Sequence, residues 1–154
     1  MADETYTMLF TEILTKVKNG NTKSRRVKLL QQYDCSALRM VIKSSFDPNI
    51  IWLLPKGEVA YVKNEAPAGT EHTTLRLEAK RLYNFIKGGN DKLAQFKRED
   101  MFIQMLEGLH ESEAELLIVA KDKRLHQVYS GLSDGVVKEA FGWDDNYVRI
   151  KQGE

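Results

Sequence analysis

The N-terminal part of the chain places apolar residues at helical spacing. Residues 5–18 are predicted to form a first helix, because their apolar positions keep to one side of it. The Asn-Gly-Asn run that follows ends this helix, since both residue types accept a left-handed backbone at low energy. Thr22 is expected to cap a second helix, and Asp34 or Ser36 a third.

The segment from residue 47 to residue 70 has a different pattern. It holds all three prolines of the chain, and two apolar runs, at 50–54 and 59–62, flank a Pro-Lys-Gly turn. Proline resists helix interiors, so this segment is expected to be extended or rich in turns. The two apolar runs on either side of a turn predict a short β-hairpin.

Helical spacing returns after residue 70. The clearest amphipathic stripe of the chain has steps of four, three and four residues and consists of Leu75, Ala79, Leu82 and Ile86. A single helix is therefore predicted here, and the Gly-Gly-Asn run at 88–90 is expected to stop it.

The C-terminal part of the chain predicts three further helices. One covers about residues 91–108, and a capping box at 112–115 is expected to start the next. Ser133 is expected to cap the last helix, which Gly142 closes. The polar residues after Trp143 are expected to form a loose tail.

These elements predict a mainly α fold, as a single compact multi-helix domain with a proline-rich extended or β-hairpin insertion. We divide the 154 residues into a basic three-helix unit (1–46), the insertion (47–70), a helical remainder (71–142) and a polar tail (143–154). No apolar run approaches the roughly 20 residues of a membrane span, and the first residues are polar, so neither a span nor a signal peptide is expected. The single cysteine, Cys35, fits a reducing compartment.

The net charge of +1 hides a gradient along the chain. Residues 1–46 carry 8 basic and 4 acidic groups, whereas residues 111–154 carry 6 and 9. Six cations lie between Glu12 and Asp34, where there is no acid. They are named here the basic cluster and consist of Lys16, Lys18, Lys23, Arg25, Arg26 and Lys28. Such a cluster either neutralises the phosphates of a nucleic acid or forms a solvated helix face.

Residues 22–45 have the outline of a helix-turn-helix, with two predicted helices joined by a short turn. The turn at 33–35 lacks the glycine that is frequent in this motif. The second helix offers few side chains for reading bases, namely Arg39, Lys43, Ser44 and Ser45. Phosphate contact without base reading is therefore favoured over recognition of a DNA sequence.

The chain has no motif for catalysis or for binding a metal or cofactor. His72, His110 and His126 are dispersed, and Cys35 has no histidine near it in the sequence. The glycine-rich run at 87–90 is too short for a phosphate-binding loop and lacks its Lys-Ser/Thr ending. No catalytic residue, metal ligand or cofactor is predicted. A protein without enzymatic activity is favoured, although dispersed active-site residues leave catalysis open.

Several longer motifs together resemble a family of small uncharacterised proteins from large contractile-tailed phages of marine bacteria, including cyanophages. The motifs are FDPNI at 46–50, NEAP at 64–67, GTEHT at 69–73, FIKGGN at 85–90, MFIQMLEGLH at 101–110 and VKEAFGW at 137–143. The resemblance covers nearly the whole chain. It implies a viral protein that acts in the cytoplasm of the infected bacterial host, and it supplies no activity, cofactor or site.

Three functions follow as expectations. The first is a phage accessory protein without enzymatic activity that binds nucleic acid, or a complex that processes it, through the basic cluster. The second is a modulator of a host factor that binds protein through the 47–70 insertion, with Trp52 and Tyr61 as anchors, because large aromatic side chains concentrate binding energy. The third is an enzyme or small-ligand binder with dispersed site residues. The expected partners are nucleic acid and a host or phage protein, and no membrane.

Overall fold

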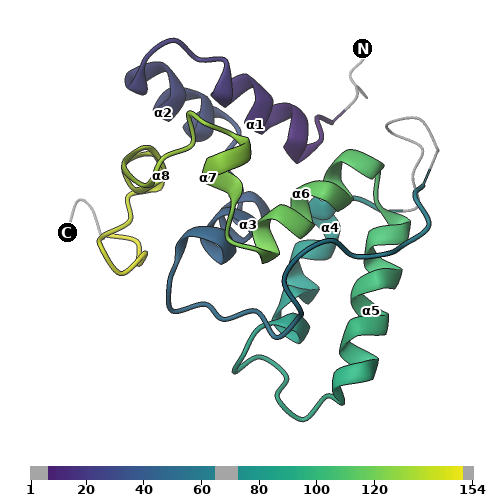
Figure 1. The fold of residues 1–154 in the computed structure, drawn as a ribbon. Helices are drawn as coiled ribbons and strands as arrows, with labels where there is room; N and C mark the ends of the chain where they lie inside the picture. The colour runs from purple at the N-terminus through teal and green to yellow at the C-terminus, as the bar shows by residue number, and fades with distance from the viewer. Residues whose placement is uncertain (1–6, 65–72, 151–154) are drawn as a thin grey trace.

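The computed structural model describes residues 7–64 and 73–150, and the regular elements of these residues are helices (Figure 1). In chain order they are α1 (Phe10–Lys18), α2 (Lys23–Gln32), α3 (Ser36–Phe46), α4 (Leu75–Glu78), the 3-10 helix η1 (Ala79–Phe85), α5 (Gln95–Gly108), α6 (Glu111–Lys121), α7 (Leu125–Val128) and α8 (Asp134–Phe141). The prediction of a mainly α fold is confirmed for the described residues.

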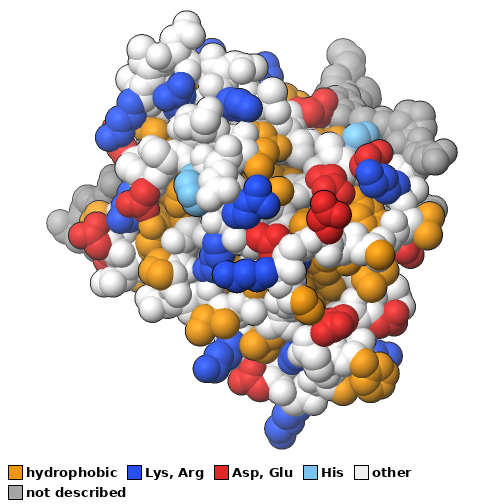
Figure 2. Space-filling model, in the orientation of Figure 1, with side chains coloured by type: hydrophobic (Ala, Val, Ile, Leu, Met, Phe, Trp, Pro, Cys, Tyr) orange, Lys and Arg blue, Asp and Glu red, His pale blue; other side chains and the backbone are white. Residues whose placement is uncertain are grey.

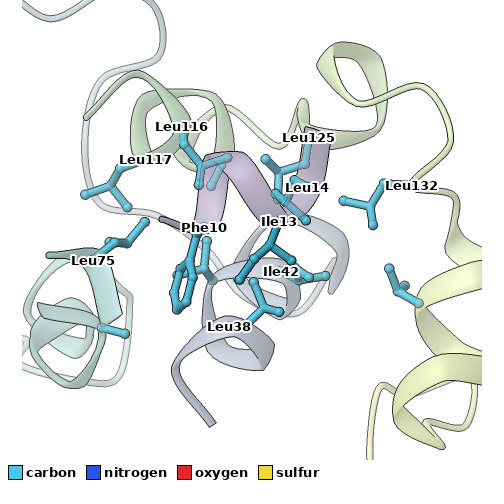
Figure 3. Close-up of a cluster of buried hydrophobic side chains, with 14 of the residues drawn as sticks. Phe10, Ile13, Leu14, Leu38, Ile42, Leu75, Leu116, Leu117, Leu125 and Leu132 are labelled. Carbon is cyan, nitrogen blue, oxygen red and sulfur yellow. The ribbon is translucent and has the colours of Figure 1, made fainter. Parts of the chain in front are cut away.

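The core forms where α1, α3, α4 and α6 converge. Figure 3 shows their side chains pointing toward one another, together with two leucines from α7 and from the segment before α8. The labelled side chains are all almost completely buried and are Phe10, Ile13, Leu14, Leu38, Ile42, Leu75, Leu116, Leu117, Leu125 and Leu132. Burial of about ten such side chains, each worth roughly 1.5–3 kcal/mol, provides much of the driving force for folding. Helix α3 lies in the middle of this arrangement, in contact with α4, η1, α6, α7 and α8.

Two predicted helix starts and one predicted end are confirmed. The Thr22 hydroxyl accepts the Arg25 amide at 3.1 Å and caps α2, and the Ser133 hydroxyl accepts the Val136 amide at 3.2 Å and caps α8. Gly142 ends α8 in the left-handed conformation, with φ of 67°. In each case the capping group lies within three residues of its partner, so the local sequence is sufficient to predict the cap.

Two other predicted caps are wrong. Helix α3 is capped by the Cys35 thiol, whose Sγ accepts the Leu38 amide at 3.4 Å. The Asp34 carboxylate instead accepts a hydrogen bond from Arg39. Helix α6 begins at Glu111 with His110 as its cap, because the His110 Nδ1 atom accepts the amide of the second helical residue at 3.1 Å. The predicted capping box at 112–115 therefore lies inside the helix.

The predicted β-hairpin in the insertion is also wrong for residues 47–64. Residues 51–53 pair with residues 85–87 instead: the Leu53 amide donates to the Phe85 carbonyl at 2.7 Å, and the Lys87 amide donates to the Ile51 carbonyl at 2.8 Å. A single antiparallel bridge between residues 52 and 86 results, and no strand forms in the described part of the insertion. Residues 65–70 of the insertion lie outside the described residues.

The second apolar run of the insertion, 59–62, lies along α5 and α6 instead of pairing with the first. The buried Lys121 ammonium donates to the Pro55 carbonyl at 2.7 Å and to the Gly57 carbonyl at 3.2 Å, so the turn between the two runs is held at the end of α6. Further along, the Val62 amide donates to the Glu107 carboxylate at 2.9 Å. The second run is therefore held by α5 and α6, while the first run pairs with residues 85–87, so the two runs do not pair with each other.

The stripe predicted to form one helix after residue 70 is divided between α4 and η1. The buried apolar residues of η1 are Ala79, Leu82 and Phe85, which are three residues apart. That spacing matches the three residues per turn of a 3-10 helix and brings these side chains to one side. Phe85 thus occupies the buried position that an α-helical spacing assigns to Ile86.

The described residues after α8 do not form a loose tail. Trp143 and Tyr147 are both buried, and an antiparallel bridge joins residues 143 and 149. The Trp143 ring packs on Phe141, with 4.9 Å between the ring centroids. Aromatic burial therefore folds residues 143–149 back onto α8, while residues 151–154 lie outside the described residues.

Candidate nucleic-acid interface

The basic cluster lies on the last turn of α1 and on α2. Five of its six side chains are exposed, and only Arg26 is half-buried. In Figure 2 the side chains of Lys and Arg gather at the upper left, over α1 and α2, whereas many acidic side chains lie to the right, over α5 and α6. The cations of the basic cluster thus form one basic region of this face, and further Lys and Arg side chains lie at its centre and lower edge.

Little of the positive charge of the cluster is neutralised by the described residues. Lys23 forms an ion pair with Glu139 at 3.3 Å, but both side chains are about 60% exposed, so water screens the pair strongly. Lys18 donates to the Val128 carbonyl at 3.3 Å, a contact with no opposite charge. Lys16, Arg25 and Lys28 form no ion pair with residues 7–64 or 73–150. The surface can therefore attract an anion.

Arg26 differs from the other five cations because its side chain is packed against the backbone of Gly131. A Cβ atom at position 131 would lie 2.4 Å from the Arg26 Nε atom and 2.8 Å from Cζ. The Nε atom is buried and makes no hydrogen bond to the described residues. Arg26 thereby anchors α2 to the segment between α7 and α8. The sequence gives no sign of this contact, because it groups Arg26 with the other five cations of the basic cluster.

The four side chains of α3 expected to read bases are half-buried or buried: Arg39 pairs with Asp34 at 2.5 Å, and Lys43 is half-buried. Ser44 and Ser45 are buried, and their hydroxyls are engaged with the Val41 carbonyl at 2.6 Å and the Leu125 amide at 3.3 Å. The helix contacts five neighbouring helices, and Met40 is one of its exposed side chains. Phosphate contact by α2 therefore stays the favoured prediction for residues 22–45, because two of the four side chains expected to read bases are buried within the chain.

Trp52, one of the two anchors predicted for a protein partner, is half-buried within the chain. Its indole Nε1 donates to the Ser44 carbonyl at 3.0 Å, and its ring meets Phe102 edge-on at 6.5 Å. The neighbouring Ile51 is 49% exposed. Ile51 is therefore the most exposed apolar side chain of the run at 50–54.

Tyr61, the other predicted anchor, is also half-buried. Its hydroxyl donates to the Glu115 carboxylate at 2.6 Å, and burial together with this hydrogen bond raises the pKa of Tyr61. The next residue, Val62, is 75% exposed. The structure does not bring Trp52 and Tyr61 into one surface with the basic cluster, which lies on other helices.

The remaining candidates for chemistry are separate from one another. The Cys35 Sγ atom caps α3 and accepts a hydrogen bond from Arg76 at 3.2 Å. His110 caps α6, and His126 lies on α7; His72 is outside the described residues. No group of three His, Cys, Asp or Glu side chains suited to a metal ion occurs among the described residues. None of the helices described is long and apolar enough to cross a membrane.

Fold and surface together define a helical protein that carries an exposed basic surface on its second helix and the end of its first. The chain belongs to DUF6433, a family of unknown function, whose family model matches residues 13–127. The matched region includes the whole basic cluster as well as Trp52 and Tyr61. No curated protein and no solved structure matches the chain.

Proposed function

We propose that this protein binds nucleic acid, or a complex that processes nucleic acid, through the basic cluster, and that it has no enzymatic activity of its own. We further propose that it is an accessory protein of a large contractile-tailed phage and acts in the cytoplasm of the infected bacterium. The observation that carries the binding proposal is the set of five exposed cations on α1 and α2, of which only one pairs with a described carboxylate.

Phosphate contact explains why so many cations are gathered on one surface. Cations this close repel one another, and an anionic polymer relieves that repulsion and releases its own counterions. Arg25 and Lys28 are three residues apart on α2 and therefore neighbours on the helix surface. Together with Lys16 and Lys18 at the end of α1, they offer contacts to phosphates without any requirement for a base sequence.

The test is binding of a fluorescent DNA duplex, followed by anisotropy over a range of salt concentrations. Each phosphate contact contributes about 0.9 to the slope of log affinity against log salt, so five contacts give a slope of roughly −4.5. The double variant Arg25→Glu with Lys28→Glu should weaken binding to all sequences alike and make the slope shallower by about 1.8.

The matched control is the double variant Lys92→Glu with Lys97→Glu, which changes the net charge by the same amount. These exposed lysines lie just before and at the start of α5, at the bottom of Figure 1, far from α1 and α2 at the top. We expect this variant to retain the slope of the wild type. Absence of binding at low salt, or an equal loss in both variants, would overturn the proposal.

The phage setting has its own test. The tagged protein is captured from infected cells with and without nuclease treatment, and the partners are identified by mass spectrometry. Partners that are lost after nuclease treatment indicate binding through nucleic acid, and partners that are retained indicate a protein complex. The alternative function, a modulator of a host factor, predicts a retained host protein whose binding is lost when exposed Ile51 and Val62 are replaced by Ser.

A further inference from the structure

A cavity of about 690 Å³ opens beside the segment that anchors Arg26. It lies between the end of α3, the turn from α6 to α7, the segment before α8 and the C-terminal turn. The side chains that define it include Phe46, Lys123, His126, Ser130, Leu132 and Tyr147. Its volume falls within the roughly 300–1,000 Å³ typical of small-molecule sites.

Two residues that line this cavity have an unfavourable backbone conformation. Lys123 has φ of 61° and Tyr147 has φ of 60°, and no other non-glycine residue in the described part of the chain has a positive φ. Lys123 follows α6 at the position where glycine is usual, since the amides of residues 123 and 124 donate back to the carbonyls of residues 120 and 119. Glycine would relax the backbone at either position but would remove a side chain from the cavity. Strain of this kind is concentrated at functional sites.

The lining combines apolar surface with polar groups at the edge. Leu132 is completely buried, and the ring of His126 meets the ring of Phe46 edge-on at 6.3 Å. Around this apolar surface lie the Ser130 hydroxyl and the Lys123 ammonium, which also donates to the Asp47 carbonyl at 2.6 Å. The Asp134 carboxylate also lies at the edge, where Lys138 pairs with it at 2.8 Å and the Tyr147 hydroxyl donates to it. A planar ring with apolar faces and polar edges matches this distribution, because its faces can stack on the aromatic side chains while its edge forms hydrogen bonds.

Residues 128–135, which contribute part of the cavity lining, also contact three cations of the basic cluster. Lys18 donates to the carbonyl of residue 128, Arg26 packs on residue 131, and the Lys23 ammonium lies 3.7 Å from where a Cβ of residue 135 would be. Figure 1 shows α8 beside α2, and these two helices are in contact. A strand whose phosphates lie on the cluster is thus one short segment away from the cavity.

We infer that this cavity accepts one unpaired base of a single-stranded nucleic acid whose phosphates lie on the basic cluster. The inference rests on the proposed function and adds the kind of nucleic acid that is bound. In a duplex the bases are paired and stacked, so none can enter the cavity without being flipped out of the helix. Stacking on aromatic side chains tolerates any base, in agreement with the small number of base-reading side chains on α3.

The experiment compares two labelled single strands of about 16 nucleotides with the same number of phosphates, oligo-dT and an abasic strand. Stacking of one base is worth about 1–3 kcal/mol, so oligo-dT should bind roughly 5- to 150-fold more tightly than the abasic strand. The variant Ser130→Phe fills the cavity from an exposed position and should reduce the affinity for oligo-dT to that for the abasic strand. Gln127→Phe, at an exposed position of α7 outside the cavity lining, should leave both affinities unchanged.

The outcomes separate this inference from the proposed function. Two results would overturn the inference that the cavity accepts a base: equal binding of the two strands by the wild type, or a preference for oligo-dT that persists in Ser130→Phe. Either result would leave the basic cluster as the binding surface. Absence of binding of both strands at low salt overturns the proposed function as well. Should Ser130→Phe fail to fold, His126→Ala removes an exposed stacking ring and should lower the preference for oligo-dT by at least about fivefold.

Discussion

Glu113 on α6 joins the N-termini of two other helices. Its side chain is only 1% exposed, and its carboxylate accepts the amide of Phe10 at 2.9 Å and the amide of Leu75 at 2.8 Å. These amides begin α1 and α4, and amides in the first turn of a helix have no partner within their own helix. Replacing Glu113 by Gln keeps the shape of the side chain but changes the groups that meet the two amides.

The expected loss of stability follows from the hydrogen bonds. In Glu113→Gln the side-chain carbonyl can still accept one amide, whereas the side-chain NH2 group faces the other, which loses its acceptor at a cost of about 1–3 kcal/mol. The remaining hydrogen bond is no longer assisted by charge and weakens by about 1 kcal/mol. Relief from burying a carboxylate opposes these losses, so we expect a net destabilisation of about 2–3 kcal/mol.

Thermal unfolding followed by far-UV circular dichroism measures this loss. In a chain of 154 residues each kcal/mol lowers Tm by about 2–4 °C, so Tm should fall by roughly 4–12 °C. The control Glu111→Gln removes the same charge from the first turn of α6, but Glu111 is exposed and pairs with Lys63 at 3.1 Å on the surface. Glu111→Gln should therefore lower the free energy of unfolding by less than about 1 kcal/mol. Equal Tm values for the two variants would refute the reasoning.

Three further substitutions probe other contacts. Lys121→Met removes the ammonium that holds two carbonyls of the 55–57 turn, and it should speed tryptic cleavage after Lys56, as mass spectrometry can follow. Burial and a hydrogen bond to an aspartate raise the pKa of Tyr147 to about 12. Because the folded pKa lies above the unfolded value near 10, this stabilisation is complete below about pH 10 and is lost as the pH rises toward 12, so Tyr147→Phe should flatten the alkaline decline of Tm. Gly131→Ala places a methyl group 2.4 Å from the Arg26 Nε atom, so the end of the Arg26 side chain has to move, and stability should fall by about 1 kcal/mol, a loss that a double-mutant cycle with Arg26→Ala should remove.

Each of these substitutions has a control at a comparable position. Lys63→Met is exposed and should not change cleavage after residue 56. Tyr83→Phe, also exposed, should follow the wild type at alkaline pH. Gly135→Ala brings its methyl group only to 3.7 Å from Lys23, an ordinary contact, and should keep or slightly raise stability, because alanine favours the helix. A variant that behaves like its control would show that the contact it changes makes no measurable contribution to cleavage, to the alkaline decline of Tm or to stability, respectively.

Helix content was predictable because its signals are local. Thr22, Ser133 and Gly142 each act on a partner a few residues away, and all three lie where the sequence predicts a helix boundary. The prediction of the hairpin failed for the opposite reason. Two apolar runs around a turn favour pairing with each other. Residues 51–53 instead pair with residues 85–87, which come later in the chain, after Pro67 and Gly69. A choice between two pairings depends on the whole fold, and local pattern does not decide it.

The candidate site shows the same division between local and distant information. The absence of acids between Glu12 and Asp34 is a local property, so the basic cluster is predictable as a set of cations. The packing of Arg26 on Gly131 joins residues that are far apart in the sequence. Lys123 and Tyr147 are harder still to find, because their residue types argue against the left-handed backbone that they adopt. A sequence pattern favours glycine or asparagine at such positions, so a cavity that depends on a lysine and a tyrosine there becomes recognisable only when the fold brings both to one place.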